Sequence, residues 1–140
     1  MSEIKVRFTK EPYEIERHGA WIDLRAAQDY EYKKGDGFLI DLGVNIKVPE
    51  GHEGIIAPRS STFKKYGLIQ ANSIGIIEHE YCGNDDVWGM FVYATRDGKV
   101  AKGDRICQFR IQEMMGDVTF NFVDDMNEES RGGWGSTGQK

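Results

Sequence analysis

Apolar residues recur at every second position in several short stretches of this chain. Residues 44–48 read Val-Asn-Ile-Lys-Val, and residues 107–111 read Cys-Gln-Phe-Arg-Ile. A period of two is typical of a β-strand with one buried face, whereas an amphipathic helix needs a period near 3.6. Residues 120–123, with Phe120, Phe122 and Val123, predict one more half-buried strand.

Seventeen glycines divide the chain into short segments. Many short strands between such turns indicate a β-sandwich, jelly roll or barrel. One helical turn is predicted at residues 60–67, where hydroxyl side chains suited to an N-cap precede a glycine suited to end a helix. The predicted fold class is therefore all-β with one short helix. The clearest turn sequences are residues 34–37, 49–51, 96–98 and 102–104.

Length and charge set limits on function. A chain of 140 residues is one domain, with a net charge of −5. Acidic character argues against a nucleic-acid partner, but a small anionic ligand can still be held by a few arginines and a metal ion. Cys82 and Cys107 lack metal or redox spacing and are expected to be free thiols. We expect a cytoplasmic protein with no membrane partner, because the chain has neither a long apolar run nor a signal-peptide pattern.

The last ten residues, 131–140, have no apolar periodicity and cannot build a core. Their glycines allow successive backbone N–H groups to turn toward an anion, and Arg131 adds a permanent planar charge. The indole of Trp134 offers a surface on which a base can stack. The alternative for this segment is a disordered, solvated tail.

Two further segments hold residues suited to phosphate chemistry. Arg59 and Ser60 stand where a strand meets the expected helix, so they form either a phosphate seat or a capped turn with a surface arginine. Asp23 lies within an apolar strand and therefore needs a charged partner or a metal-bound water. Gln108 either contacts a phosphate oxygen or faces solvent, and Asp104 and Arg105 beside it are read either as site residues or as a structural pair.

The segment 72–83 combines two apolar arms around Gly75 with a turn at residues 83–85. Near its far end, Glu78 or Glu80 can orient a water as a general base, and Tyr81 can form a wall of a sugar pocket. The alternative is an ordinary hairpin with exposed glutamates. His79 is expected to be solvated, because the chain has no metal-ligand spacing around it.

Taken in order, five segments resemble the five motifs of the trimeric dUTP pyrophosphatases (dUTPases). The resemblance runs from about Gly19 to Gly138 and is strongest to the branch from Gram-positive bacteria and their phages. It implies a jelly-roll-like β-barrel at residues 1–126 and a flexible C-terminal arm at residues 127–140. The segments are residues 21–26, 57–61, 72–83, 103–108 and 131–138.

The resemblance also implies Mg²⁺-dependent hydrolysis of dUTP to dUMP and pyrophosphate. It implies a homotrimer in which the arm of one subunit closes over a site made by the other two. The implied catalytic residues are Glu78, which positions the attacking water, Asp23, which holds waters of the Mg²⁺, and Arg131, which binds the γ-phosphate. The implied substrate-binding residues are Arg59, Ser60, Ser61, Asn72, Gly75, Ile77, Tyr81, Gln108, Trp134, Gly135, Ser136 and Thr137.

The sequence departs from the family pattern at two positions. Glu78 stands where the third motif normally carries aspartate, so either the backbone compensates, or Glu80 shares the role, or the enzyme is slow. Trp134 follows Arg131 by three residues where the family has an aromatic five residues on, so Trp134 stacks differently or Trp88 or Phe91 replaces it. Two alternatives therefore stand beside the dUTPase: a protein of this fold that binds dUTP and acts through protein partners, and a dCTP deaminase.

Overall fold

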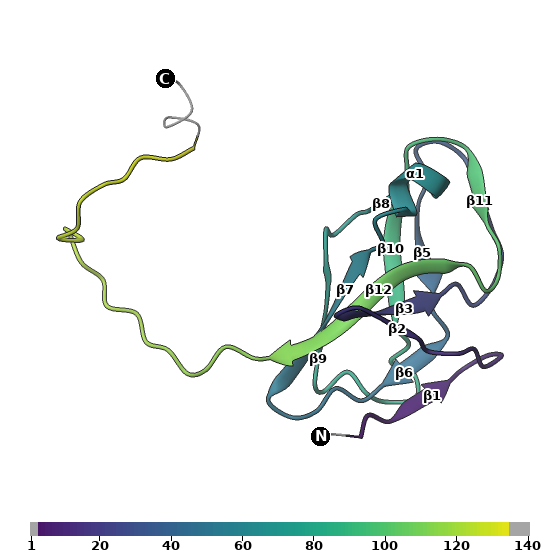
Figure 1. Ribbon diagram of the computed structural model, residues 1–140, viewed down its shortest axis with the longest axis horizontal. Helices are drawn as coiled ribbons and strands as arrows, with labels where there is room; N and C mark the ends of the chain where they lie inside the picture. The colour runs from purple at the N-terminus through teal and green to yellow at the C-terminus, as the bar shows by residue number, and fades with distance from the viewer. Residues whose placement is uncertain (1–2, 135–140) are drawn as a thin grey trace.

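The computed structural model describes residues 3–134, which contain twelve strands and one helix (Figure 1). None of the helices in this range has the length and hydropathy needed to cross a membrane. The all-β class with one short helix is confirmed. The strands are β1 (Val6–Phe8), β2 (Arg17–His18), β3 (Trp21–Arg25), β4 (Tyr30–Tyr32), β5 (Gly37–Asp41), β6 (Val44–Ile46), β7 (His52–Pro58), β8 (Leu68–Gln70), β9 (Gly75–Glu78), β10 (Gly89–Ala94), β11 (Gly98–Val100) and β12 (Arg105–Glu113), and the helix is α1 (Thr62–Tyr66).

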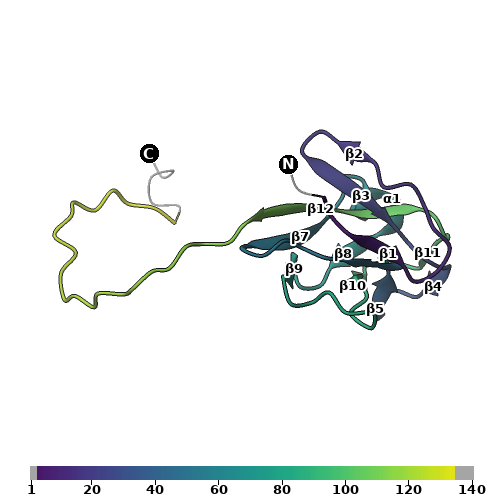
Figure 2. The same cartoon turned by 90° about the horizontal axis from the view of Figure 1, so that it is seen from below.

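The strands form four antiparallel sheets. The largest has the order β2-β3-β12-β7-β9, and a three-stranded sheet has the order β5-β10-β8. Two ribbons, β1-β6 and β11-β4, complete the body. Figure 2 shows β2, β3 and β12 on one side of the body and β5 and β10 on the other. Within residues 3–134 the sheets pack in layers, and their hydrogen bonds do not close into one continuous barrel.

Strand β12 is the centre of the largest sheet and confirms the strand predicted at residues 107–111. Cys107 and Phe109 are buried in the core, while Arg110 faces solvent. The strand predicted at residues 44–48 is confirmed as β6, although Asn45 is buried where the alternation predicts exposure. Burial of Asn45 is tolerated because its amide accepts a hydrogen bond from Arg7 and donates one to the carbonyl of Asp86.

The core between the layers contains Trp88, whose side chain is fully buried. Its ring packs edge-to-face on Phe109, with 5.2 Å between centroids. Gly54 on β7 permits this packing, since a Cβ there would lie 3.0 Å from Cη2 of Trp88. The suggestion that Trp88 covers the base is therefore wrong, because a side chain committed to the core cannot reach a ligand.

The predicted helix is present as α1 and ends, as expected, at a glycine. Gly67 adopts a left-handed conformation with φ of 68°, which costs a glycine little. The expected N-cap differs in detail, because Ser61 makes no side-chain capping hydrogen bond. Instead the hydroxyl of Thr62 accepts a hydrogen bond from the Arg59 N–H at 2.9 Å and donates to the Ile106 carbonyl at 3.0 Å, tying the helix to β12.

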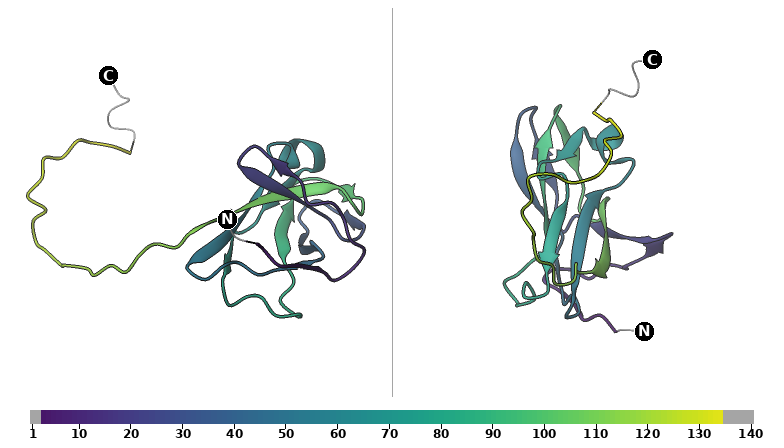
Figure 3. Two further views of the ribbon diagram at one scale, coloured as in Figure 1. Left: turned by 60° about the horizontal axis from the view of Figure 1, so that its bottom comes forward. Right: turned by 90° about the vertical axis from the view of Figure 1, so that its left-hand side faces the viewer.

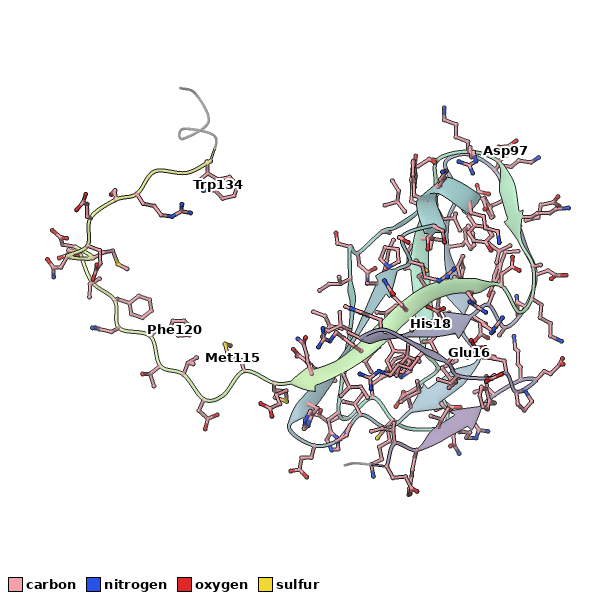
Figure 4. All side chains as sticks on the ribbon, viewed as in Figure 1. Glu16, His18, Asp97, Met115, Phe120 and Trp134 are labelled. Atoms are coloured by element: carbon pink, nitrogen blue, oxygen red, sulfur yellow. The ribbon has the colours of Figure 1, made fainter. Side chains whose placement is uncertain are left out.

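The segment after β12 is extended and leaves the body (Figures 1 and 4). The predicted strand at residues 120–123 is wrong, since no strand follows Glu113 in the described range. Phe120 and Phe122 are 78% and 93% exposed. No sheet of the described chain covers these two side chains. Within residues 3–134 regular structure ends at Glu113, and the domain boundary at residue 126 stays a prediction.

Candidate functional site

Asp23 on β3 is the most buried carboxylate near the predicted phosphate seat, with only 6% of its surface exposed. Its Oδ1 lies 3.3 Å from Nε of Arg59. Its Oδ2 lies 3.7 Å from Nε2 of His18 and 4.0 Å from Nη1 of Arg105. Asp23 thus has the charged partners that its position within an apolar strand predicts. Its Oδ2 nevertheless accepts no hydrogen bond from any described residue.

The ladder around β12 explains why these residues meet. Gln108 is the register partner of Asp23 on β3 and of Ala57 on β7. Directly opposite residues of an antiparallel pair share a face, so Gln108 and Asp23 project from the same side of the sheet. The amide of Gln108 donates to the Pro58 carbonyl at 3.1 Å, which fixes it at the end of β7 beside Arg59.

The predicted seat at residues 57–61 occupies the turn between β7 and α1. Arg59 is partly buried, and its Nη1 lies 3.3 Å from the Ser61 hydroxyl. Ser60 is exposed beside it. Arg59 is thus held between Asp23 and Ser61, and the choice between a phosphate seat and a capped turn with a surface arginine stays open.

A depression of about 280 Å³ adjoins Arg59 and carries an excess of positive charge. Four cationic side chains and one carboxylate line it. The cations are oriented by anchors outside the depression, since Arg25 and Arg105 lie 3.5 and 3.8 Å from Glu16. Such a surface suits a polyphosphate. Its lining residues are Arg25, Arg59, Lys65, Gly103, Asp104 and Arg105.

Asp104 and Arg105 do not form the structural pair considered from the sequence. Asp104 accepts hydrogen bonds from the Tyr66 hydroxyl and the Ala101 N–H, both at 3.0 Å. Burial, together with Asp104, raises the pKa of Tyr66 to about 12, which keeps this hydroxyl a donor. Arg105 turns instead toward Glu16 and Asp23.

Glu16 and His18 belong to this cluster, and neither was predicted. His18 lies 3.2 Å from Glu16 as well as near Asp23 (Figure 4). Both residues precede the turn at Gly19, whose φ is 64°, so β2 folds back along β3 and brings them beside Asp23. The signal in the sequence was the spacing of two, which places Glu16 and His18 on one face.

A second pocket, of about 360 Å³, lies around β9. Tyr81 forms an exposed wall, and its hydroxyl donates to the Val87 carbonyl at 3.0 Å. Glu78 and Glu80 are both exposed, as in the alternative of an ordinary hairpin. The turn at residues 83–85 is confirmed by mutual hydrogen bonds between Gly83 and Asp86. The pocket is lined by Leu39, Ile76, Ile77, Glu78, Tyr81, Val87 and Gly89.

The alternative of an ordinary hairpin for this segment is wrong. β9 pairs with β7, and the preceding strand β8 pairs with β10, so the two apolar arms join different sheets. Gly75 lies where they separate, and a Cβ there would lie 3.3 Å from Cβ of Ile56. Asn72 is exposed in the turn before it. His79 is partly exposed, and its Nδ1 lies 2.8 Å from the Val48 carbonyl.

The two pockets lie near opposite ends of β7. In the β7–β9 ladder Gly75 is opposite Ile56 and Glu78 is opposite Glu53. Arg59 lies about six residues beyond Glu53 along the chain, which corresponds to roughly 20 Å in extended strand. Glu78 therefore does not face Asp23 and Arg59 in the same protomer. One chain presents two separate groups of predicted site residues. They are here called, after their predicted roles, the phosphate half-site (Asp23, Arg59 and Gln108) and the nucleoside half-site (around Glu78 and Tyr81).

Of the C-terminal residues predicted for the site, the structure describes Arg131 and Trp134, which lie apart from both half-sites. Arg131 and Trp134 are exposed on the extended segment, away from the body (Figure 4). Gly135, Ser136 and Thr137 lie outside the described residues. The cysteines are free, with Cys82 partly buried and Cys107 buried.

Residues 3–134 contain no cluster of three or more His, Cys, Asp or Glu side chains arranged to bind a metal directly. The residues nevertheless fit a hydrated Mg²⁺, which keeps several waters and is bound through few carboxylates. The buried Oδ2 of Asp23 lacks a hydrogen-bond donor. A metal-bound water would supply one.

Comparison with known proteins gave concordant results. A sequence model of the family described as dUTPase matches residues 12–138. The chain is 52% identical over 122 residues to the SPbeta prophage-derived deoxyuridine 5'-triphosphate nucleotidohydrolase YosS of Bacillus subtilis, covering 87% of this chain and 86% of that protein. It is 34% identical over 142 residues to the deoxyuridine 5'-triphosphate nucleotidohydrolase of Yarrowia lipolytica, covering 96% and 88%.

Solved structures support the same fold. The dUTPase of Staphylococcus bacteriophage 80alpha, solved with dUpNHpp, superposes with a TM-score of 0.79 at 18% identity, covering 98% of this chain and 99% of that one. A dUTPase from phage phi11 of S. aureus, described with a structural Mg(II) ion, gives a TM-score of 0.74 at 18% identity, covering 89% and 99%.

Proposed function

Because the chain belongs to the dUTPase family, we propose that it hydrolyses dUTP to dUMP and pyrophosphate. The observation that carries this proposal is the pair of half-sites, one cationic and one with a tyrosine wall and a carboxylate. Together they offer what a nucleoside triphosphate requires. Both relatives described above carry the name of this activity.

The phosphate half-site binds the triphosphate chain. Arg59 offers a charged fork already oriented by Asp23, and Ser60 and Ser61 offer hydroxyls at the same turn. Gln108 presents its amide from β12 beside them. Arg131, from the arm, neutralises the γ-phosphate, with Gly135, Ser136 and Thr137 adding amides and hydroxyls. Charge neutralisation and positioning are most of what a protein contributes to attack on an already anionic phosphorus.

Mg²⁺ is the proposed cofactor, held mainly by the substrate phosphates and reached from the protein by Asp23. The buried, unpartnered Oδ2 of Asp23 would hold the hydrated ion by accepting a hydrogen bond from one of its waters. When bound, the ion withdraws charge from the phosphate oxygens and orients the chain. Arg59 and Arg105 flank the Asp23 carboxylate and hold it in position for this role.

Glu78 positions the attacking water. It is exposed at the end of β9, on the wall of the nucleoside pocket, where a second subunit can approach it. Compared with aspartate, its extra methylene moves the carboxylate by roughly 1.5 Å. Glu80 is a second exposed carboxylate near the same surface. Kinetic comparison of Glu78→Gln with Glu80→Gln distinguishes the roles of the two residues.

The nucleoside pocket selects deoxyuridine. Tyr81 packs under the deoxyribose, where a 2′-hydroxyl would clash, and its hydroxyl is tethered to Val87. Asn72 and the backbone of Gly75 and Ile77 read the uracil edge. A site built to pair with O4 and N3–H leaves buried groups unpaired against cytosine, which can cost a factor of about 10⁴. Trp134 or the half-exposed Phe91 covers the base.

A homotrimer with exchanged arms brings the halves together. Two observations support it besides the separation of the half-sites. The outer face of the β5-β10-β8 sheet exposes four apolar side chains that are neighbours in the ladder, Leu39, Ile69, Phe91 and Tyr93. The arm exposes Phe120 and Phe122, whose alternation suits a sheet face, although no strand of residues 3–134 pairs with this segment.

The proposed location is the cytoplasm of a bacterium or of a phage-infected cell. Unpaired Cys82 and Cys107 suit a reducing compartment. The prophage origin of the B. subtilis relative supports the same setting.

A second candidate is a nucleotide-responsive role through protein partners. Glu78 favours it, because a displaced carboxylate slows hydrolysis without removing binding. The 80alpha dUTPase, whose likeness to this chain shows the fold alone, is itself described as controlling transfer of virulence genes. The dCTP deaminase considered from the sequence has no comparable support.

One assay separates these functions. The protein is incubated with Mg²⁺ and each of dUTP, dCTP, dTTP and UTP, and pyrophosphate and ammonia are measured. Pyrophosphate from dUTP alone is the expected result. Ammonia from dCTP would identify a deaminase, and dUTP binding without turnover would identify the regulatory protein.

A further inference from the structure

The β1–β6 ribbon carries an unbalanced group of cations. In its register Arg7 is opposite Asn45, so Lys5 is opposite Lys47, and the backbone N–H of Lys47 donates to the Lys5 carbonyl at 3.0 Å. Alternate residues of a strand share a face, which places Lys5, Arg7 and Lys47 together. Like charges directly opposite each other destabilise a ladder.

These cations border a groove of about 480 Å³, here called the basic groove and lined by Lys5, Val6, Arg7, Asn45, Lys47, Cys82 and Asn84. None of its lining residues is a carboxylate. The ion pairs of the described residues include none made by Lys5, Arg7 or Lys47. Glu3 borders the adjoining depression with Lys5 and Lys47 but pairs with neither. The groove therefore suits an anionic partner.

The arm contains a segment of opposite charge. Residues 124–129 read Asp-Asp-Met-Asn-Glu-Glu and are all exposed. Their four carboxylates stand immediately before Arg131, and the segment contains no cation. The arm leaves its own body after Met114, whose N–H is held by the Gly51 carbonyl at 2.9 Å (Figure 3). Ten residues of extended chain then span about 33 Å, enough to reach a neighbouring subunit.

We propose that the basic groove of one subunit binds the acidic segment 124–129 of a neighbouring subunit's arm. This inference rests on the proposed trimer with exchanged arms and names the surface on which the arm is anchored. Anchoring raises the effective concentration of Arg131 at the active site, as a short tether does for any second binding event. The contact is between exposed charges and therefore weakens as salt increases.

Cys82 provides a direct test, because it lines the groove while burial raises the pKa of the other thiol, Cys107, and leaves it unreactive. In the full-length M126C variant, mild oxidation with copper phenanthroline should link Cys82 of one subunit to position 126 of another, giving a dimer on a non-reducing gel. The M126C/C82S variant lacks the thiol in the groove and should give no such dimer. M115C is the matched control for an arm position outside the acidic segment.

Charge reversal tests the cause of the contact. Adding K5E/K47E to M126C should lower the dimer yield at least fivefold, and 1 M NaCl should have the same effect. Adding D124K/D125K as well should restore the yield, because the charges are then exchanged rather than lost. Restoration excludes simple misfolding of the K5E/K47E variant.

The inference is overturned if M126C gives no dimer, if M115C gives an equal yield, or if the yield does not depend on charge and salt. A linked monomer places the segment in its own groove and also overturns it. Duplex DNA that binds the wild type but not K5E/K47E, without cross-linking, assigns the groove to nucleic acid. Hydrolysis of dUTP is assayed in parallel, so normal turnover without the cross-link refutes the groove alone, and the cross-link without turnover refutes the proposed function alone.

Discussion

Arg59 lies in the turn after β7 and Asp23 lies on β3, yet Nε of Arg59 is 3.3 Å from Oδ1 of Asp23, which is almost fully buried. The ion pair holds the guanidinium at the rim of the cationic depression and leaves Oδ2 free of donors. One buried carboxylate thus orients an arginine with one oxygen and keeps the other available.

Asp23→Asn should therefore affect metal dependence and stability together. Loss of a charged hydrogen-bond acceptor beside Arg59 is expected to lower the free energy of unfolding by about 2 kcal/mol. The Mg²⁺ concentration for half-maximal activity should rise at least tenfold. Magnesium titrations of kcat and urea denaturation measure the two effects. An unchanged Mg²⁺ requirement would contradict the role proposed for Oδ2.

Glu78→Gln should abolish most hydrolysis while sparing dUTP binding. Loss of the base is expected to reduce kcat by about 10²- to 10⁴-fold. Glu80→Gln is the matched control, because Glu80 is equally exposed two residues away. Steady-state kinetics and calorimetric titration with a non-hydrolysable analogue give the comparison. If Glu80→Gln is the variant that loses turnover, the two glutamates must exchange roles.

Two inactive variants should restore each other in mixed trimers. Arg59→Ala damages only the phosphate half-site and Glu78→Gln only the nucleoside half-site. If each site draws these halves from different subunits, an equal mixture re-assembled together should recover about a quarter of the wild-type sites. Activity of the mixture, compared with either variant alone, decides the matter. No recovery despite confirmed mixing would mean that both halves act within one chain.

Truncation after Asn127 should leave a folded assembly with little activity. Every strand of the described chain ends by Glu113, so removal of residues 128–140 leaves the core intact. The truncation removes Arg131 and with it the charge placed on the γ-phosphate. Thermal unfolding and sedimentation test the fold, while kcat/KM tests the arm. A truncated protein with full activity would refute the arm as a lid.

Gly54→Ala should destabilise the core. A Cβ at this position meets the Trp88 ring at 3.0 Å, and the cost of such overpacking is about 1–3 kcal/mol. Gly116→Ala is the control, because a Cβ at Gly116 meets no atom within 4 Å. Urea unfolding of both variants measures the difference. Equal midpoints would mean that the Trp88 ring moves aside freely.

Local patterns in the sequence predicted local structure well. The alternation at Cys107, Phe109 and Ile111 predicted β12, and Gly67 predicted the end of α1. The same alternation failed at Phe120 and Phe122, because a half-buried strand needs a sheet to cover, and the described chain offers none there. An alternating pattern predicts that one face of a segment is buried. It does not identify the chain that buries this face.

The site was predicted unevenly for a related physical reason. Asp23 was identified because a carboxylate within an apolar strand demands a partner. Glu16 and His18 escaped notice because their role depends on a turn at Gly19 that brings β2 against β3. The placement of the half-sites at separate ends depends on β9 pairing with β7 instead of β8, a choice that no short motif encodes.

If each active site combines half-sites from different subunits, as proposed, hydrolysis depends on the concentration of the protein. If a lone chain holds only fragments of a site, specific activity falls on dilution wherever the assembly dissociates, even though every strand remains folded. The amount of protein in the cell would then act as a threshold control on the reaction, without any effector molecule.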